Sequence, residues 1–183
     1  MRNSKMKGFT LIELIVVIAI IGILAAILVP SMLGYVRNAR ISSANSGAKQ
    51  VHTACASALT QLGISNWDWG ASSGTFGTVV INQGVGDGKV TVTGGGSNNP
   101  NAGVMDLGSY LGDEFKDYGI AVFDPETYSV SHAGYATTEA GWNVIKDFDA
   151  PSDFTAIIEA TQKADAKGGK IYGIYPAPKA ANS

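Results

Sequence analysis

One stretch near the N-terminus constrains the fold of this chain more than any other. Residues 9–29 are almost all Ile, Leu, Val and Ala, and they contain a single carboxylate, Glu13. As an α-helix this stretch would be about 30 Å long, at about 1.5 Å per residue, which is enough to cross the hydrocarbon core of a membrane. Acidic residues at membrane depth are costly and usually mark function, so Glu13 is the least expected residue in the sequence.

A short basic leader precedes the apolar stretch. Residues 1–8 contain Arg2, Lys5 and Lys7 and no acidic residue. Because positively charged flanks stay on the cytoplasmic side, we expect a single membrane pass with the N-terminus in the cytoplasm and everything after Pro30 outside.

Two ordinary interpretations of this stretch are incomplete. A secretory signal peptide would be cut beside small residues such as Ala25 and Ala26, but the apolar run continues beyond them. A plain membrane anchor explains the length and the basic flank, but it gives no reason for Gly8 or Glu13.

The segment Lys7-Gly8-Phe9-Thr10-Leu11-Ile12-Glu13 resembles the class III signal of type IV prepilins. The resemblance implies that a prepilin peptidase cuts between Gly8 and Phe9, and that Phe9 becomes N-methylated. It also implies that Glu13 pairs with the free amine of Phe9 on a neighbouring subunit during assembly. Such a pairing is physically reasonable, because an ammonium partner offsets the cost of desolvating a carboxylate.

Two helix-weakening residues interrupt the apolar stretch. Pro30 lacks a backbone N–H and clashes with the preceding turn, so we expect a kink or local melting over residues 26–30. Gly22 and Pro30 match the positions of the helix breakers in type IV pilins, where this segment is implicated in extension during filament assembly.

The pattern becomes one-sided after Pro30. Apolar residues recur at three- and four-residue steps between Val36 and Leu62, and polar residues such as Asn45 and Gln61 occupy the other side. This periodicity predicts an amphipathic continuation of the same helix. We therefore expect four parts: a leader (1–8), a membrane or filament-core helix (9–30), an amphipathic helix (31–63) and a globular β-rich head (64–183).

The head is expected to contain short strands joined by turns. Alternating β-branched residues predict strands at 78–82 and 89–93, and alternation predicts two more at 119–123 and 128–131. A last strand is expected at 171–175. Residues 133–136 are ambiguous, and helices are predicted at 137–146 or at 153–163, of which the second is favoured. Because the strand signals come as hairpins, we expect an antiparallel sheet packed on the N-terminal helix, an α+β pilin fold.

Charge and cysteine content exclude some classes of protein. The formal net charge is −2, and removal of residues 1–8 leaves 10 basic and 15 acidic residues, a formal −5. That balance opposes attraction of the bulk surface to nucleic-acid phosphates. The single cysteine, Cys55, excludes an intrachain disulfide, which makes the chain more similar to the cysteine-poor pilins of Gram-positive bacteria.

Two patterns with catalytic associations have simpler explanations. His52 and Cys55 lie three residues apart, but no orienting partner is evident, and core packing is the favoured role for both. Gly84, Gly86 and Gly88 lack the lysine and the following helix of a phosphate-binding loop, so a hairpin connection is favoured.

Two further groups of residues are candidates for ligand binding. Trp67 and Trp69 could form an aromatic surface for carbohydrate, although such residues more often build a core or a subunit contact. Asp147, Asp149 and Asp153 could supply oxygen ligands to Ca²⁺, although their spacing is not that of an EF-hand and Asp153 could instead cap a helix.

The resemblance implies a structural subunit of a type IV pilus, a helical homo-oligomer that serves adhesion, twitching motility or aggregation at the cell surface. Its implied partners are a prepilin peptidase, a platform protein and an assembly ATPase, with nucleic acid a partner only in DNA uptake. Alternatives are a pseudopilin of type II secretion and a minor pilin or adhesin that binds carbohydrate or a host surface. No catalytic set emerges, so we expect neither an enzyme nor a cofactor.

Overall fold

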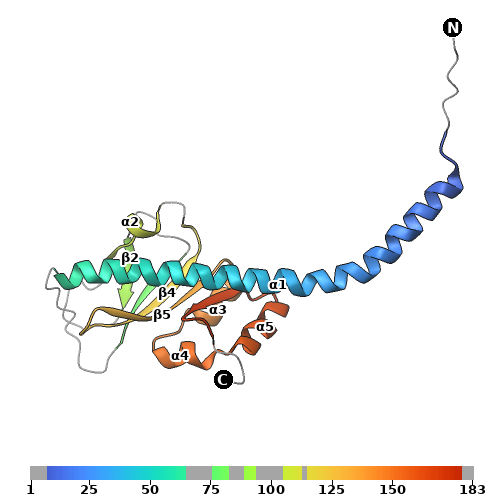
Figure 1. The fold of residues 1–183 in the computed structure, drawn as a ribbon. Helices are drawn as coiled ribbons and strands as arrows, with labels where there is room; N and C mark the ends of the chain where they lie inside the picture. Colours follow the sequence, from blue (N-terminus) through green and yellow to red (C-terminus); the bar gives the residue numbers. More distant parts are fainter. Residues whose placement is uncertain (1–7, 65–75, 83–88, 94–104, 113–114, 179–183) are drawn as a thin grey trace, which may run out of the picture. The chain divides into compact units, whose positions relative to one another are not determined.

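The computed structural model describes residues 8–64, 76–82, 89–93, 105–112 and 115–178. They fall into two compact units, Met1–Val36 and Arg37–Ser183. One long helix, α1 (Leu11–Ile64), runs through both units and is the first element in Figure 1.

The first unit contains the N-terminal part of α1. This part is helical without a break through Gly22 and Pro30, so the local melting expected near Pro30 is absent from this structure. One lost backbone hydrogen bond is tolerated because the adjoining turns keep theirs, and Ser31 Oγ donates to the carbonyl oxygen of Leu28 at 2.8 Å. The softening of this segment during assembly stays a prediction.

The second unit is built on an antiparallel sheet of six strands in the order β3-β2-β1-β4-β5-β6. The strands are β1 (Gly77–Ile81), β2 (Lys89–Thr93), β3 (Met105–Asp106), β4 (Tyr118–Asp124), β5 (Ser129–Ala136) and β6 (Tyr172–Tyr175). The predicted α+β arrangement of a long helix and a small antiparallel sheet is confirmed. The antiparallel pairing of β1 with β2 confirms the predicted hairpin, whose glycine-rich connection lies outside the described residues.

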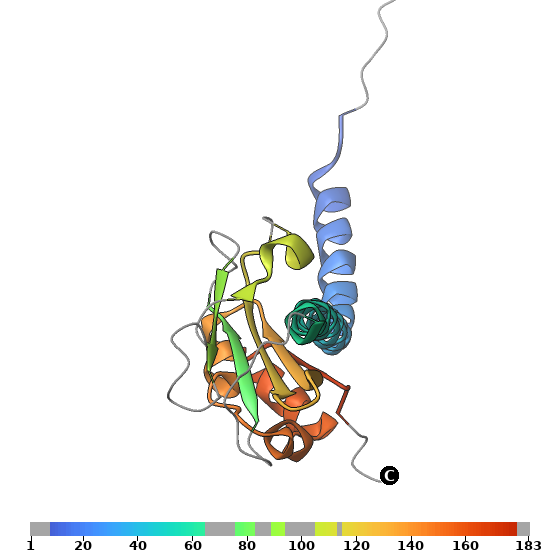
Figure 2. The ribbon, with the colours of Figure 1, turned by 90° about the vertical axis from the view of Figure 1, so that its left-hand side faces the viewer.

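Helices cover both faces of the sheet (Figures 1 and 2). On one face, Val51, Cys55 and Leu59 of α1 pack with Val79 and Phe123 of the sheet. The other face carries the short helices α3 (Glu139–Ile145) and α4 (Pro151–Ala156), while α5 (Glu159–Lys167) precedes β6 and α2 (Gly108–Leu111) precedes β4. The domain is therefore a three-layer sandwich with the sheet in the middle.

The central strand β4 does not alternate between buried and exposed residues. Six of its seven residues are buried, and only Asp124 at the end is partly exposed. Ala121 and Phe123 face α1, whereas Ile120 and Val122 face the short helices. A strand buried on both faces reads as a continuous apolar run. Its neighbour β5 extends through the ambiguous residues 133–136.

The inward face of α1 begins at Ile41 and consists largely of small residues. They are Ala44, Gly47, Ala48, Ala54 and Ala58. At Gly47 an added Cβ would lie 2.6 Å from the ring of Tyr135, so glycine is required for this ring to reach the helix. Small side chains here let the helix backbone approach the sheet closely.

The closest approach occurs where β6 passes α1. A Cβ built on Gly173 would lie 1.9 Å from the carbonyl oxygen of Ala44 and 2.4 Å from the backbone nitrogen of Asn45. Backbone atoms cannot rotate away as a side chain can, so this contact allows only glycine.

The helix predicted at 153–163 is wrong in its bounds. The chain forms α4 and α5, separated at Ile157 and Ile158, and both of these residues have extended backbone angles. The break lets Phe154 pack with the core on the α3 side while Gln162 and Ala166 turn toward β6 and α1. The other predicted helix, at 137–146, is present as α3, and Thr138 caps its start by accepting a hydrogen bond from Gly141 N.

Candidate functional site

The N-terminus of α1 is closed by a reciprocal hydrogen-bonded cap. Glu13 Oε2 accepts from Thr10 N at 2.8 Å and from Thr10 Oγ1 at 2.5 Å, and Glu13 N lies 3.4 Å from Thr10 Oγ1. A threonine followed three residues later by glutamate is the sequence pattern of a capping box. Sequence reasoning assigned Glu13 a role between subunits and missed Thr10, although this pattern was available to find it.

The cap uses only one of the two carboxylate oxygens. Within the described residues, both hydrogen bonds to the Glu13 side chain end on Oε2, and none ends on Oε1. Glu13 is fully exposed in the isolated chain. Its carboxylate can therefore hold the start of α1 and still accept a second donor.

Apolar side chains surround Glu13 on α1 and are open to the surroundings. Phe9 is 86% exposed and Leu11 75%, and the large apolar residues from Ile12 to Val36 are all exposed as well. Within the described part of the chain, α1 is the one helix long and apolar enough to cross a membrane. A helix that is apolar all round needs a lipid or protein environment.

The structure places His52 and Cys55 in packing roles. Cys55 is fully buried, and burial raises the pKa of its thiol to about 12, which keeps it protonated and unreactive. His52 Nε2 donates to the carbonyl oxygen of Val130 at 3.1 Å, and its ring packs edge-on against Tyr175. The two side chains do not form a nucleophile and base.

A second histidine, His132, lies on β5 with its ring stacked on Phe154. Its Nδ1 is buried and has no hydrogen-bond partner in the part of the chain that the structure describes. Burial lowers the pKa of His132, and the nearby charge of His52 lowers it further. Burial also lowers the pKa of His52, and the hydrogen bond to Val130 only partly offsets this effect.

These two histidines predict a loss of stability in acid. A histidine whose pKa is lowered on folding binds protons more readily in the unfolded chain, so stability is lost as pH falls below about 6.5. We expect the unfolding temperature, followed by near-UV circular dichroism, to fall between about pH 7.5 and about pH 5. His132→Phe keeps an aromatic ring against Phe154 and should flatten this decline. If the unfolding temperature of this variant falls with pH as steeply as that of the wild type, His132 is not a source of the acid sensitivity.

The three candidate calcium ligands do not converge. Asp153 Oδ2 accepts from the backbone N–H groups of Asp149 and Ala150, at 3.1 and 3.0 Å, and so caps α4. Among the described residues, which include Asp147, Asp149 and Asp153, no group of three or more His, Cys, Asp or Glu side chains is placed to hold a metal ion. The cap explains Asp153 without calcium. Trp67 and Trp69 lie outside the described residues.

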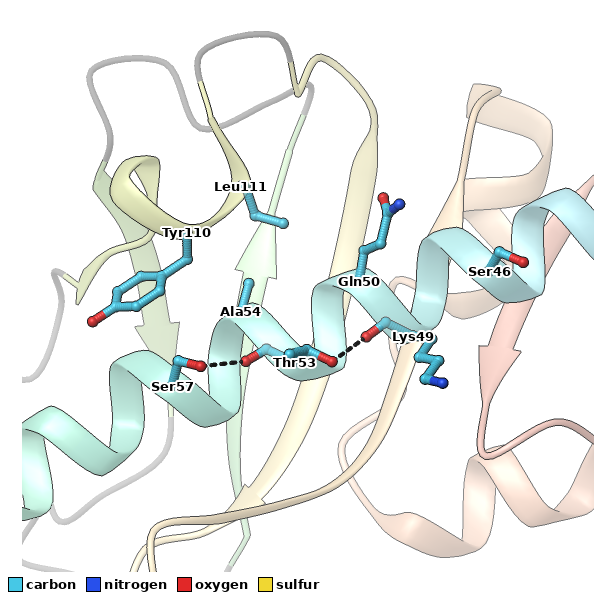
Figure 3. A pocket seen from close by; sticks show the side chains of 8 residues that line it. All are labelled: Ser46, Lys49, Gln50, Thr53, Ala54, Ser57, Tyr110 and Leu111. Carbon is cyan, nitrogen blue, oxygen red and sulfur yellow. Dashed lines mark hydrogen bonds between the residues drawn. The ribbon is translucent and has the colours of Figure 1, made fainter.

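A groove of about 660 Å³ runs between α1 and α2 (Figure 3). Its lining residues are Ser46, Lys49, Gln50, Thr53, Ala54, Ser57, Tyr110 and Leu111. The hydroxyls of Thr53 and Ser57 donate to backbone carbonyls one turn earlier in α1. The described lining contains hydroxyl groups and the amine of Lys49 but no carboxylate, histidine or cysteine that could serve a hydroxyl as its base.

Known proteins share the N-terminal part of this chain. Residues 3–29 match the prokaryotic N-terminal methylation motif. The type IV major fimbrial protein FimA of Dichelobacter nodosus is 47% identical over 57 residues, which are 31% of this chain and 36% of that protein. A fimbrial protein of Neisseria meningitidis is 36% identical over 81 residues, or 44% of this chain and 45% of that protein.

The type IV major pilin protein PilA of Myxococcus xanthus is 46% identical over 52 residues, 28% of this chain and 24% of that protein. The chain thus spans less than half the length of these relatives. No solved structure matches it significantly.

The methylation motif falls on the capped, exposed apolar helix, so the N-terminal part of this chain is similar to that of type IV prepilins. The resemblance of this chain to type IV pilins is confirmed by its match to the major fimbrial and pilin proteins. The closer likeness to the cysteine-poor pilins of Gram-positive bacteria stays a prediction.

Proposed function

We propose that this chain is a structural subunit of a type IV pilus that polymerises through its N-terminal apolar helix. The observation that carries the proposal is the exposure of every large apolar side chain of α1 from Leu11 to Val36, next to a methylation motif. Burying this surface among other copies of the same helix removes it from water or lipid and supplies the free energy of assembly. Adhesion, twitching motility or aggregation would be properties of the finished filament.

Processing and location follow from the same segment. A prepilin peptidase removes residues 1–8 by cutting between Gly8 and Phe9, and Phe9 is then N-methylated. Before assembly the helix of residues 9–30 spans the plasma membrane with its N-terminus in the cytoplasm. Residues 31–63 and the head, 64–183, lie outside. An assembly ATPase and a platform protein extract the subunit from the membrane.

Glu13 is the docking point between subunits. Its Oε2 remains engaged with Thr10, while Oε1 is open to the ammonium group of Phe9 on a neighbouring chain. In a filament core poor in water, an ion pair of this kind offsets the cost of burying both charges. It also fixes the axial position of one helix against the next. Gly22 and Pro30 are the positions where α1 can lengthen without losing many hydrogen bonds.

Mass spectrometry of filaments sheared from the cell surface tests this proposal. We expect this chain to be their dominant protein and its first residue to be methylated Phe9. A chain that is processed but never present in surface filaments would overturn the pilus role and favour a pseudopilin. A chain present in trace amounts would favour a minor pilin.

A further inference from the structure

A buried polar cluster joins three elements that are far apart in the sequence. Asn45 Oδ1, on α1, accepts from Ile174 N on β6 at 3.0 Å and from Gln162 Nε2 on α5 at 2.9 Å. Gln162 Nε2 also donates to the carbonyl oxygen of Tyr172 at 2.8 Å. Gln162 is only 1% exposed, although amide side chains mostly lie at the surface of proteins.

The orientations of both amides are fixed by the backbone. Ile174 N–H can only donate, so the Asn45 atom that faces it is the oxygen. The carbonyl of Tyr172 can only accept, so the Gln162 atom that faces it is the nitrogen. The two side chains are therefore complementary to each other as well as to β6, and turning either amide over would break contacts on both sides.

Few apolar side chains attach α5 and the start of β6 to α1. The cluster shared by α1 and the end of α5 contains Ile41, Ala44, Ala166 and Ile171, apart from the main core clusters. Within α5 itself only Gln162 and Ala166 are buried. Because Cys55 is the only cysteine, no intrachain disulfide can fasten the segment covalently.

The polar contacts border water. Asn45 and Gln162 line a groove of about 400 Å³, together with Asn38, Glu159 and Lys163, the last two of which form an ion pair. Water entering from this groove can replace the amide hydrogen bonds once they loosen, which lowers the cost of opening.

We propose that Asn45 and Gln162 form a polar clamp that holds a C-terminal strap, Glu159–Tyr175, on α1 and sets how often that strap opens. Opening separates β6 from α1 and from the edge of β5, while strands β1, β4 and the rest of β5 stay folded. Opening also removes Tyr172 and Ile174 from the buried cluster that contains Ile120 and Val122 of β4, so the clamp acts together with this apolar packing. In the proposal, the strap is a unit of lower local stability than the central sheet.

Hydrogen exchange on the full-length chain in detergent micelles tests the clamp. Asn45→Ala removes the acceptor of Ile174 N–H and one of the two acceptors of Gln162 Nε2, so strap amides should exchange about tenfold faster or more. The amides of Val79 and Ile81 in β1, whose side chains lie in the cluster with α1 and not in the one with the strap, should keep their wild-type rates. Equal acceleration in β1 would overturn the strap and make Asn45 an ordinary part of the global core.

Limited trypsin digestion gives a second readout. Lys163 lies inside α5, so cleavage after it requires opening of the strap, whereas Lys49, inside α1, serves as an internal reference. Gln162→Met removes both donated hydrogen bonds and should speed cleavage after Lys163 but not after Lys49. The matched controls Asn38→Ala and Gln50→Met, both exposed on α1, should leave both rates unchanged.

A double-mutant cycle distinguishes a clamp from two independent contacts. If Asn45 and Gln162 act as a pair, the double variant should open little more often than the stronger single variant. Fully additive effects on the opening rate would show that the two side chains act separately and would overturn the clamp.

Discussion

Cells that express Glu13→Gln as their only copy of this chain should carry about tenfold fewer surface filaments or less, with normal cleavage between Gly8 and Phe9. The amide keeps an acceptor oxygen for the cap with Thr10, because glutamine serves in a capping box as glutamate does. It lacks the charge that would pair with the ammonium group of a neighbouring Phe9. Counting filaments by electron microscopy, with immunoblots for processing, measures both expectations.

Thr10→Val is the matched variant for this experiment. It removes the hydroxyl of the cap but leaves the carboxylate of Glu13 in place. If charge pairing is the function of Glu13, Thr10→Val should retain most filaments while Glu13→Gln loses them. Normal piliation by Glu13→Gln would refute the pairing, and equal loss in both variants would assign the defect to the cap.

The second large effect is expected at Gly173. Gly173→Ala places a methyl group about 2 Å from the backbone of Ala44, so α1 and β6 must move apart along their line of contact. Overpacking of this kind costs about 1–3 kcal/mol or more, and backbone atoms on the opposing side put this case at the upper end. For a domain of this size, that is a fall in unfolding temperature of about 6–12 °C.

Near-UV circular dichroism follows this unfolding, because Trp142 is buried and stacked on Tyr118 with ring centroids 5.4 Å apart. Gly34→Ala is the control, since no atom lies within 4 Å of the added Cβ and alanine favours a helix. An unchanged unfolding temperature for Gly173→Ala would mean that the contact with α1 is looser than the structure places it.

The long helix and the hairpins were predictable because each rests on a local signal. Apolar periodicity defined α1, and β-branched alternation with turn residues defined β1 and β2. The turn after β4 also followed its chemistry, since Asp124 Oδ1 accepts from Glu126 N at 2.8 Å.

The parts that sequence reasoning missed depend on distant partners. Asn45 falls on the polar side of the helical pattern, yet it is half-buried because β6, some 129 residues later, brings Ile174 N–H to its side chain. The break between α4 and α5 likewise depends on two different partners. It lets Phe154 pack in one core cluster while Gln162 donates a hydrogen bond to Tyr172 of β6. No window of neighbouring residues contains this information.

The small residues that line the inward face of α1 have a mechanical consequence. Alanine and glycine leave few long, rotatable side chains between the helix backbone and the sheet, and the interior of a protein is close-packed and barely compressible. Tension applied along the helix therefore reaches the sheet with almost no slack. In the proposed filament, the sheet would therefore move in step with the part of α1 on which it packs.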